Sequence, residues 1–247
     1  MKITSVNNEL VKETAKLLKN KYREETSCFL IEGEKAVNEA IQSGLKLKYI
    51  FVEENYKLYN GDNVIETTEA VLSKISDAKS APKVVAVAEQ LKHTTQSLKN
   101  SKKILLLEGI KDAGNLGTIL RTSVAFGVDC IVLYGNTVDL YNPKCVRSAV
   151  GNLWKIPVVS IDNLTELKNL FGDYERIATL PKGENVINLK DYIAGEKTLI
   201  MFGSEADGLS EELKNFATKN VTIEMEPDVE SLNLSISVAV LVYTIFK

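Results

Sequence analysis

Residues 104–133 form the stretch that most constrains what this chain can fold into. An apolar run from Ile104 to Leu107 is typical of a strand buried on both faces, and a glycine-rich turn follows it. From Leu116 the apolar residues recur at helical spacing up to Gly127, and a second apolar run comes next. A strand, a helix and a strand in this order predict a βαβ unit, and therefore a parallel sheet.

Polar residues on the other side of this helix are candidates for ligand recognition. Asn115 is expected at the N-cap, and Thr118 and Arg121 follow it at helical spacing. An amide and a guanidinium beyond the carboxyl end of a strand suit a phosphate or a ribose. An ordinary cap and a solvated arginine explain the same residues equally well, so this helix alone does not decide between the two interpretations.

Composition excludes several classes of function. The net charge of −3 gives no global electrostatic case for nucleic-acid binding, so any such site must be a local patch. The single histidine, His93, lies in a polar stretch, which rules out a His-dependent triad and a multi-histidine metal site. Neither a P-loop nor a G-x-G-x-x-G fingerprint occurs. Three cysteines without metal spacing, and no apolar signal core at the N-terminus, predict a soluble cytoplasmic protein without metal or membrane segment.

The 247 residues favour two α/β domains. Short helices and strands alternate over 1–90, a polar linker covers 91–102, and an open sheet with helices on both faces is expected over 103–247. The expected helices are 8–19, 36–43, 69–75, 116–126, 143–152, 164–171, 210–218 and 232–246. The expected strands are 28–31, 47–52, 64–67, 84–88, 104–107, 128–133, 156–159, 177–180, 198–202 and 221–225.

A cluster of basic residues marks the first helix. Lys12, Lys16, Lys19 and Arg23 fall within a short span and are candidates for contacting phosphates. A solvated face balanced by Glu24 and Glu25 is a slightly simpler explanation of the cluster.

Two further loops are expected at the carboxyl edge of the second sheet. The segment FGSEADGLS follows a strand directly, so its glycines allow close approach to a ligand and Glu205 offers a carboxylate. The segment SLNLS places Ser231 and Asn233 at the start of an almost wholly apolar helix. Such a helix should be buried, in part against a second subunit.

Taken in order, NLGTILR, FGSEADGLS and VESLNLSISVA resemble the three signature motifs of the SpoU (TrmH-like) branch of the SPOUT RNA methyltransferases. RSAVGNLWKIPV also looks like sequence of this family, and FLIEGEKAVNEAI is similar to its L30e-like substrate-binding domain. Two departures affect the turns: Ala113 stands where the family often has proline, and so does Glu224.

The resemblance implies a C-terminal domain tied in a deep trefoil knot, a homodimer through that domain, and S-adenosylmethionine as methyl donor. The reaction implied is methylation of a ribose 2′-hydroxyl in structured RNA, most simply 23S rRNA, with tRNA as the alternative substrate. The positions matched to cofactor contacts are Leu180, Phe202, Gly203, Gly208, Ile223, Met225, Leu232 and Asn233. The positions matched to the catalytic set are Asn115, Arg121, Glu205, Ser231 and Asn233. The candidates for RNA contact are Lys12, Lys16, Lys19, Arg23, Arg121 and Arg147.

Because a guanidinium stays protonated, Arg121 is expected to orient the hydroxyl and stabilise the developing alkoxide rather than act as a free base. Two other classes remain open on the sequence. One is a catalytically silent RNA-binding or ribosome-assembly protein on the same fold. The other is a different nucleotide-binding α/β enzyme such as an oxidoreductase, against which the missing dinucleotide fingerprint argues.

Overall fold

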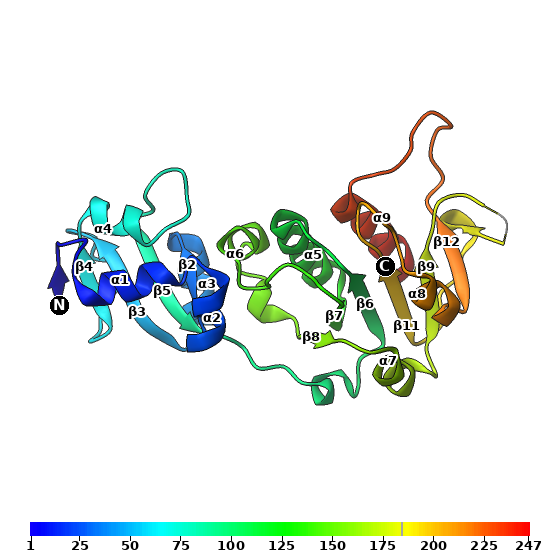
Figure 1. Ribbon diagram of the computed structural model, residues 1–247, viewed down its shortest axis with the longest axis horizontal. Helices are drawn as coiled ribbons and strands as arrows, with labels where there is room; N and C mark the ends of the chain where they lie inside the picture. The colour runs from blue at the N-terminus through cyan, green and yellow to red at the C-terminus, as the bar shows by residue number, and fades with distance from the viewer. Residues whose placement is uncertain (184) are drawn as a thin grey trace. The chain divides into compact units, whose positions relative to one another are not determined.

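The computed structural model describes residues 1–183 and 185–247, and their contacts divide the chain into two compact units. The first unit comprises Met1–Lys92 and Asp139–Lys155, and the second comprises His93–Val138 and Ile156–Lys247. Each unit has its own sheet (Figure 1). The first unit therefore includes a segment that lies, in sequence, between two strands of the second unit's sheet.

The sheet of the first unit is mixed. Its strands are β1 (Lys2–Ile3), β2 (Cys28–Glu32), β3 (Leu47–Glu53), β4 (Val64–Thr67) and β5 (Val84–Glu89). The order is β1-β4-β3-β5-β2, in which β4 pairs in parallel with β1 and β3, and β5 pairs antiparallel with β3 and β2. Of the two outermost strands, β2 is buried along its whole length, whereas Lys2 of β1 is exposed.

The helices of this unit are α1 (Glu9–Lys16), α2 (Asn20–Thr26), α3 (Glu34–Gln42), α4 (Glu69–Lys74) and, from the later segment, α6 (Pro143–Ala149). They bury apolar side chains, except α2, whose buried residue is Arg23. Val11 of α1 and Val71 of α4 share a core with Leu30, Phe51 and Val85 of the sheet. Asn8 and Thr68 cap α1 and α4 through their side chains, which satisfies backbone N–H groups in the first turns.

The sheet of the second unit is all-parallel, as the βαβ pattern predicts. Its strands among the described residues are β6 (Lys103–Glu108), β7 (Cys130–Tyr134), β8 (Val158–Ile161), β9 (Glu175–Thr179), β10 (Ile187–Asn188), β11 (Thr198–Phe202) and β12 (Lys219–Thr222). The order is β10-β12-β9-β11-β6-β7-β8. The central strands β6, β7 and β11 carry long apolar runs because both of their faces are covered.

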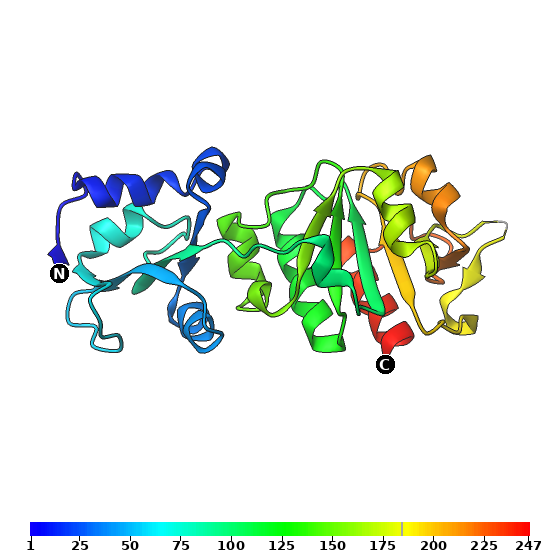
Figure 2. The same cartoon turned by 90° about the horizontal axis from the view of Figure 1, so that it is seen from below.

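Helices lie on both faces of this sheet, as Figures 1 and 2 show from two directions. They are α5 (Ala113–Phe126), α7 (Leu164–Phe171), α8 (Glu211–Phe216) and α9 (Leu234–Phe246). Leu167 of α7 and Leu213 of α8 pack in one core with Leu106 and Met201 of the sheet. Helices α5 and α9 pack against each other on the opposite face.

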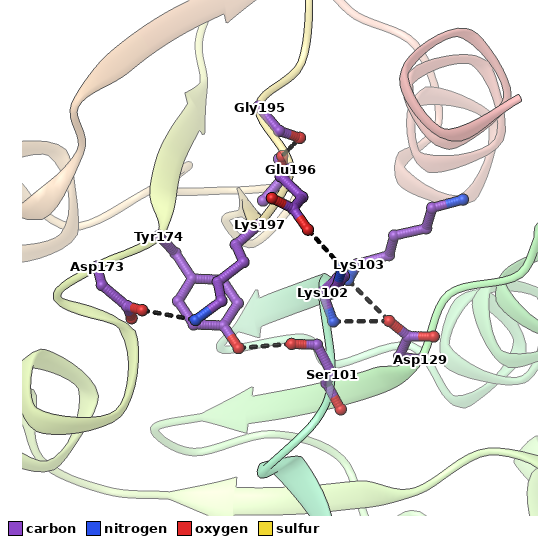
Figure 3. A network of polar contacts seen from close by, with 10 residues as sticks. Ser101, Lys102, Lys103, Asp129, Asp173, Tyr174, Gly195, Glu196 and Lys197 are labelled. Atoms are coloured by element: carbon purple, nitrogen blue, oxygen red, sulfur yellow. Dashed lines mark hydrogen bonds and ion pairs between the residues drawn. The ribbon is translucent and has the colours of Figure 1, made fainter.

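The amino edge of the same sheet is held by polar contacts (Figure 3). The Asp129 carboxylate accepts hydrogen bonds from the backbone N–H groups of Lys102 and Lys103, at 2.7 and 2.9 Å. The Tyr174 hydroxyl donates to the carbonyl of Ser101. These contacts fix the start of β6 at the amino edge, whereas ligands in open α/β sheets bind at the opposite, carboxyl edge.

The structure confirms the predicted α/β class and the parallel sheet, and it corrects several boundaries. The expected helix 8–19 corresponds to α1, which ends at Lys16, and the following helix α2 (Asn20–Thr26) was not predicted. The two-residue strands β1 and β10 were not predicted, since two residues carry no periodicity. Strands β8 and β12 are each displaced by about two residues from their predicted positions. No helix in the described ranges is long and apolar enough to cross a membrane.

Candidate active site

A cavity of about 730 Å³ opens at the carboxyl edge of the second sheet, where ligands bind in open α/β folds. Three segments build it, each running from the end of a strand into the loop that follows: 179–183 from β9, 202–209 from β11, and 221–223, 225 and 230–232 from β12. Helix α9 closes one side through Leu234 and Leu241. The cavity therefore combines apolar side chains with the exposed backbone of three loops.

The loop from Gly203 to Gly208 is a tight turn. The Gly208 N–H donates to the carbonyl of Ser204 at 3.0 Å, and the Asp207 N–H donates to Oγ of Ser204 at 3.0 Å. A Cβ atom at Gly203 would lie 1.9 Å from the carbonyl carbon of Gly208 and 2.2 Å from the nitrogen of Leu209. Only glycine fits at this position, because the two ends of the loop touch there.

The far end of this loop is anchored to the sheet. Glu108, the last residue of β6, accepts a hydrogen bond from the backbone N–H of Ser210 at 2.7 Å. Ser210 then caps α8 by accepting from the N–H of Leu213. Tyr134 donates to the Glu212 carboxylate, and burial together with this bond raises the pKa of the tyrosine hydroxyl, which keeps it protonated as a donor. The loop is therefore held on a rigid scaffold.

Asn115, Glu205 and Asn233, predicted from three separate motifs, meet in one hydrogen-bonded chain. Nδ2 of Asn115 donates to Oε1 of Glu205 at 2.6 Å. Nδ2 of Asn233 donates to Oδ1 of Asn115 at 3.1 Å. The chain joins the first turn of α5, the glycine loop and the start of α9.

The structure corrects the predicted N-cap of α5. The cap is Asp112, whose Oδ1 accepts from the backbone N–H of Asn115 at 2.8 Å. Asn115 therefore lies within the first turn of the helix, and its side chain is available for Glu205 and Asn233. An aspartate three residues before Asn115 is a signal that could have placed the cap.

Glu224, which stands where the family often has proline, ties the last loop to a neighbouring segment. Its carboxylate pairs with Nζ of Lys190 at 2.7 Å and accepts from Nδ2 of Asn188 at 2.8 Å. The hydrogen bond from Lys190 is the main reason that the pKa of Glu224 lies below its ordinary value. The side-chain contacts of Glu224 thus restrain the loop at a position where a proline ring would have fixed the backbone angle φ.

The residues assigned to the cofactor fall around the cavity with one exception. Leu180, Phe202, Gly203, Gly208, Ile223, Met225 and Leu232 line it, and so do Glu205 and Ser231 of the catalytic set. Asn233 does not line it and instead caps α9, accepting from the N–H of Ser235. Lys182 and Lys214 also line the cavity and were not singled out, since isolated surface lysines carry no sequence signal.

Arg121 lies apart from these residues. Its side chain is exposed, does not line the cavity, and forms no hydrogen bond or ion pair with the residues that the structure describes. It lies six positions after Asn115 on α5, which corresponds to about 9 Å along the helix axis. Its guanidinium is therefore free for a ligand that extends beyond the cavity.

The residues suggested for RNA contact differ in availability. Lys12 and Lys19 are exposed on α1 and directly after it. Arg23 is 2% exposed, and its guanidinium donates to Asp139 and to the carbonyl of Leu17, so it is part of the interior of the first unit rather than of its surface. Arg147 pairs with Glu32 at 3.0 Å and with Asp77. Lys16 pairs with Glu13. Of the proposed set in this unit, Lys12 and Lys19 are the cations whose side chains pair with no residue that the structure describes.

The cavity fits S-adenosylmethionine by its size and its chemistry. Its volume lies within the range of small-molecule sites, and Leu180, Phe202 and Ile223 supply apolar surface for a flat base. The backbone N–H groups of Glu230 and Ser231 donate to no residue in the described ranges, which leaves donors for polar groups of a ligand. Gly203, where no Cβ fits, brings backbone close to the cavity. No group of three or more potential metal ligands occurs among the described residues.

Comparison with protein families gives two matches that together span most of the chain. Residues 102–243 match the model of the SpoU rRNA Methylase family. Residues 8–86 match the model of the MRM3-like substrate binding domain.

Known proteins align over almost the whole length. A Bacillus subtilis protein named 23S rRNA (guanosine(2553)-2′-O)-methyltransferase RlmP is 30% identical over 245 residues, which cover 98% of this chain and 97% of that protein. A Sinorhizobium meliloti rRNA methyltransferase, solved with AdoMet bound, superposes with a TM-score of 0.88 at 27% identity and covers 99% of this chain and 96% of that one. A structure described as an RNA 2′-O ribose methyltransferase gives 0.83 at 29% identity, covering 99% and 97%.

A parallel sheet with a glycine-rich loop and a cavity at its carboxyl edge, matched by these relatives, defines an RNA methyltransferase. The Asn115–Glu205–Asn233 chain lies at the same edge and joins the three motifs that resemble this class. The chain belongs to the SpoU family, and its N-terminal region is an MRM3-like, L30e-like substrate-binding domain.

Proposed function

We propose that this protein transfers a methyl group from S-adenosylmethionine to a ribose 2′-hydroxyl of 23S rRNA. The observation that carries the proposal is the meeting of three distant motifs beside one cavity, through the bonds from Asn115 to Glu205 and from Asn233 to Asn115. The B. subtilis relative, whose name specifies 23S rRNA, supports large-subunit rRNA as the substrate class.

The proposed cofactor site is the cavity. Gly203, Ile223 and Leu232 would hold the cofactor mainly through backbone groups, and Leu180, Phe202, Gly208 and Met225 would complete the wall. When bound, S-adenosylmethionine supplies a methyl group made electrophilic by its sulfonium. The residues of the chain then need to provide an in-line geometry and a way for the hydroxyl proton to leave.

Arg121 is the proposed residue that orients the ribose. It is exposed and unpaired among the described residues, so its guanidinium can donate to the reacting oxygen and stabilise the alkoxide as it develops. The hydroxyl proton would pass to a phosphate oxygen of the RNA, because a guanidinium at neutral pH has no free lone pair to accept it. Ser231, on the cavity wall, and Glu205 would position the ribose and the cofactor.

A trefoil knot is part of the proposal, and the strand order supports it. The chain leaves β9 toward β10 at one edge of the sheet, and it later leaves β12 to reach α9, which packs on α5. Both connections begin at the carboxyl ends of β9 and β12, which are neighbouring parallel strands. A trefoil knot requires one connection to pass through the loop formed by another, which ordinary folds avoid.

A homodimer through the second unit is also proposed. Ile236, Val240 and Tyr243 lie on one stripe of α9 and are 51%, 37% and 60% exposed. Tyr243 packs edge-on against Phe126 of α5, with ring centroids 5.4 Å apart, which widens this apolar surface. An apolar helix face of this kind is typical of a subunit interface.

The domain roles proposed are RNA binding by residues 1–90, a linker at 91–102, and catalysis by residues 103–247. Lys12 and Lys19 are the surface cations through which the first domain would contact phosphates. The cytoplasm, where thiols stay reduced, is the compartment proposed, because Cys28, Cys130 and Cys145 are free and buried.

The test is transfer of labelled methyl from S-adenosylmethionine to rRNA and tRNA purified from a strain that lacks the gene. The methylated ribose is mapped by its resistance to alkaline cleavage, beginning with the nucleotide that corresponds to G2553. Label at one 23S position is the expected result. Label in tRNA alone would overturn the substrate, and absence of both label and cofactor binding would instead support a catalytically silent RNA-binding protein.

A further inference from the structure

The start of α9 holds Ser235, the last residue of the segment SLNLS, to which the motif comparison gives no role. Ser235 is 6% exposed, and its hydroxyl donates to Oδ1 of Asn233 at 2.7 Å. Its backbone N–H donates to the same oxygen at 2.9 Å. Asn233 therefore receives two hydrogen bonds on one atom, and its Nδ2 is left to point toward Asn115.

The direction of every bond in this chain is fixed by chemistry at both ends. A backbone N–H can only donate, so the atom of Asn233 that faces Ser235 must be the oxygen. Nδ2 of Asn233 then requires an acceptor on Asn115, which leaves Nδ2 of Asn115 to face Glu205. A carboxylate can only accept when ionised, so the last bond agrees with the first.

We propose that Ser235 is a positioning residue of the methyltransferase site, acting through Asn233 and Asn115 on the carboxylate of Glu205. This inference rests on the proposed function. The hydroxyl of Ser235 adds a second restraint on the Asn233 amide, and the three bonds transmit that restraint to Glu205 on the cavity wall. One oxygen of Glu205 accepts from Asn115, and the other has no hydrogen-bond partner in the described part of the chain, so it can meet a ligand.

Three structural features make the restraint effective. The hydrogen-bonded chain links the first turn of α5, the glycine loop and the start of α9, which are separate in sequence. Its inner end at Ser235 is buried, so water does not compete for the hydroxyl there. The reaction needs in-line alignment, and small displacements of a positioning group lower the rate steeply.

The experiment compares Ser235→Ala with wild type in methyl transfer under saturating RNA and cofactor. The expected result is a kcat lower by about threefold to tenfold, the effect of one neutral hydrogen bond, with the Kd for S-adenosylmethionine within about twofold of wild type. The backbone N–H of residue 235 still caps the helix, so the variant is expected to fold. Ser235→Thr retains a hydroxyl and is expected to recover most of the rate.

A matched control and a second background separate positioning from packing. Ser123 is fully buried on α5, and its hydroxyl has no partner in the described part of the chain, so Ser123→Ala removes a buried hydroxyl without touching the amide chain. Its kcat is expected to equal that of wild type. In an Asn115→Ala background, where the chain is already broken, Ser235→Ala is expected to lower kcat by less than about twofold.

A readout independent of turnover distinguishes failure of this inference from failure of the proposed function. In ¹⁵N-labelled protein, Ser235→Ala is expected to shift the side-chain amide resonances of both Asn233 and Asn115. If those resonances do not move, or if the two substitutions act additively on kcat, Ser235 is not a positioning residue. If wild type transfers no methyl to any RNA while the resonances shift as expected, the proposed function is wrong and the hydrogen-bonded chain stands.

Discussion

Replacing Gly203 by alanine tests whether the close contact in the glycine loop shapes the cofactor site. The added Cβ would lie 1.9 Å from the carbonyl carbon and 2.1 Å from the oxygen of Gly208. Carbon atoms in contact are normally about 3.5–4.0 Å apart, so the loop must open by roughly 1.5–2 Å. Overpacking of this kind lowers the free energy of unfolding by about 1–3 kcal/mol.

The same movement displaces the wall of the cavity, so affinity for S-adenosylmethionine is expected to fall at least tenfold. At a cofactor concentration of about 100 times the wild-type Kd, binding stabilises wild type by about 2.7 kcal/mol. A tenfold weaker Kd reduces that gain to about 1.4 kcal/mol at the same concentration. Calorimetric unfolding of wild type and Gly203→Ala, each with and without cofactor, measures how much the cofactor stabilises each protein.

Gly44→Ala is the matched control. Gly44 has a positive φ of 73°, and a Cβ there meets nothing within 4 Å, so alanine costs about 1 kcal/mol of backbone strain in the first unit without steric clash. The Gly44→Ala protein should be less stable than wild type without cofactor, yet cofactor binding should stabilise it by the full value of about 2.7 kcal/mol. A Gly203→Ala protein that retains the full 2.7 kcal/mol, within about 0.5 kcal/mol, would refute the reasoning.

Three further outcomes are expected. Arg121→Ala should lower kcat by at least about a hundredfold with cofactor affinity unchanged, because the side chain lies outside the cavity; near-normal turnover would remove Arg121 from the mechanism. Burial lowers the pKa of His93, so stability is full above the unfolded pKa of about 6.5 and falls as pH drops through the lower folded value. His93→Gln should flatten this acid limb in unfolding curves measured between about pH 7 and 5. Glu32→Gln should destabilise the first unit by about 1–3 kcal/mol, since the buried carboxylate is paired with Arg147. Urea titration of wild type and Glu32→Gln measures this loss of stability, and an unchanged unfolding midpoint would contradict it.

The fold class and much of the architecture could be predicted from the sequence, because long buried strands and amphipathic helices leave periodic patterns. Helix α7 and strands β4 and β11 have their predicted bounds. The two-residue strands carry no such pattern, and neither does the break between α1 and α2.

The chemistry of the site was predictable only in part. The three motifs could be recognised from residue type and order, and the structure brings Asn115, Glu205 and Asn233 together. The role of Asp112 as cap and the contact of Ser235 with Asn233 depend on local geometry that residue type does not determine. Arg23 was a candidate for RNA contact, yet it is buried and paired with Asp139. Asp139 is far along the chain, and the sequence gives no sign that the two residues would pair in the interior.

The placement of Asp139–Lys155 in the first unit has a consequence for how the protein is made. The carboxylate that neutralises Arg23 and the guanidinium that neutralises Glu32 both belong to this later segment. During synthesis the first ninety-two residues emerge with two charged groups that have not yet met their partners, and burying them at that stage is unfavourable. The amino-terminal unit of this protein can thus reach its final form only after residue 155 has left the ribosome, when two strands of the other sheet have already been translated.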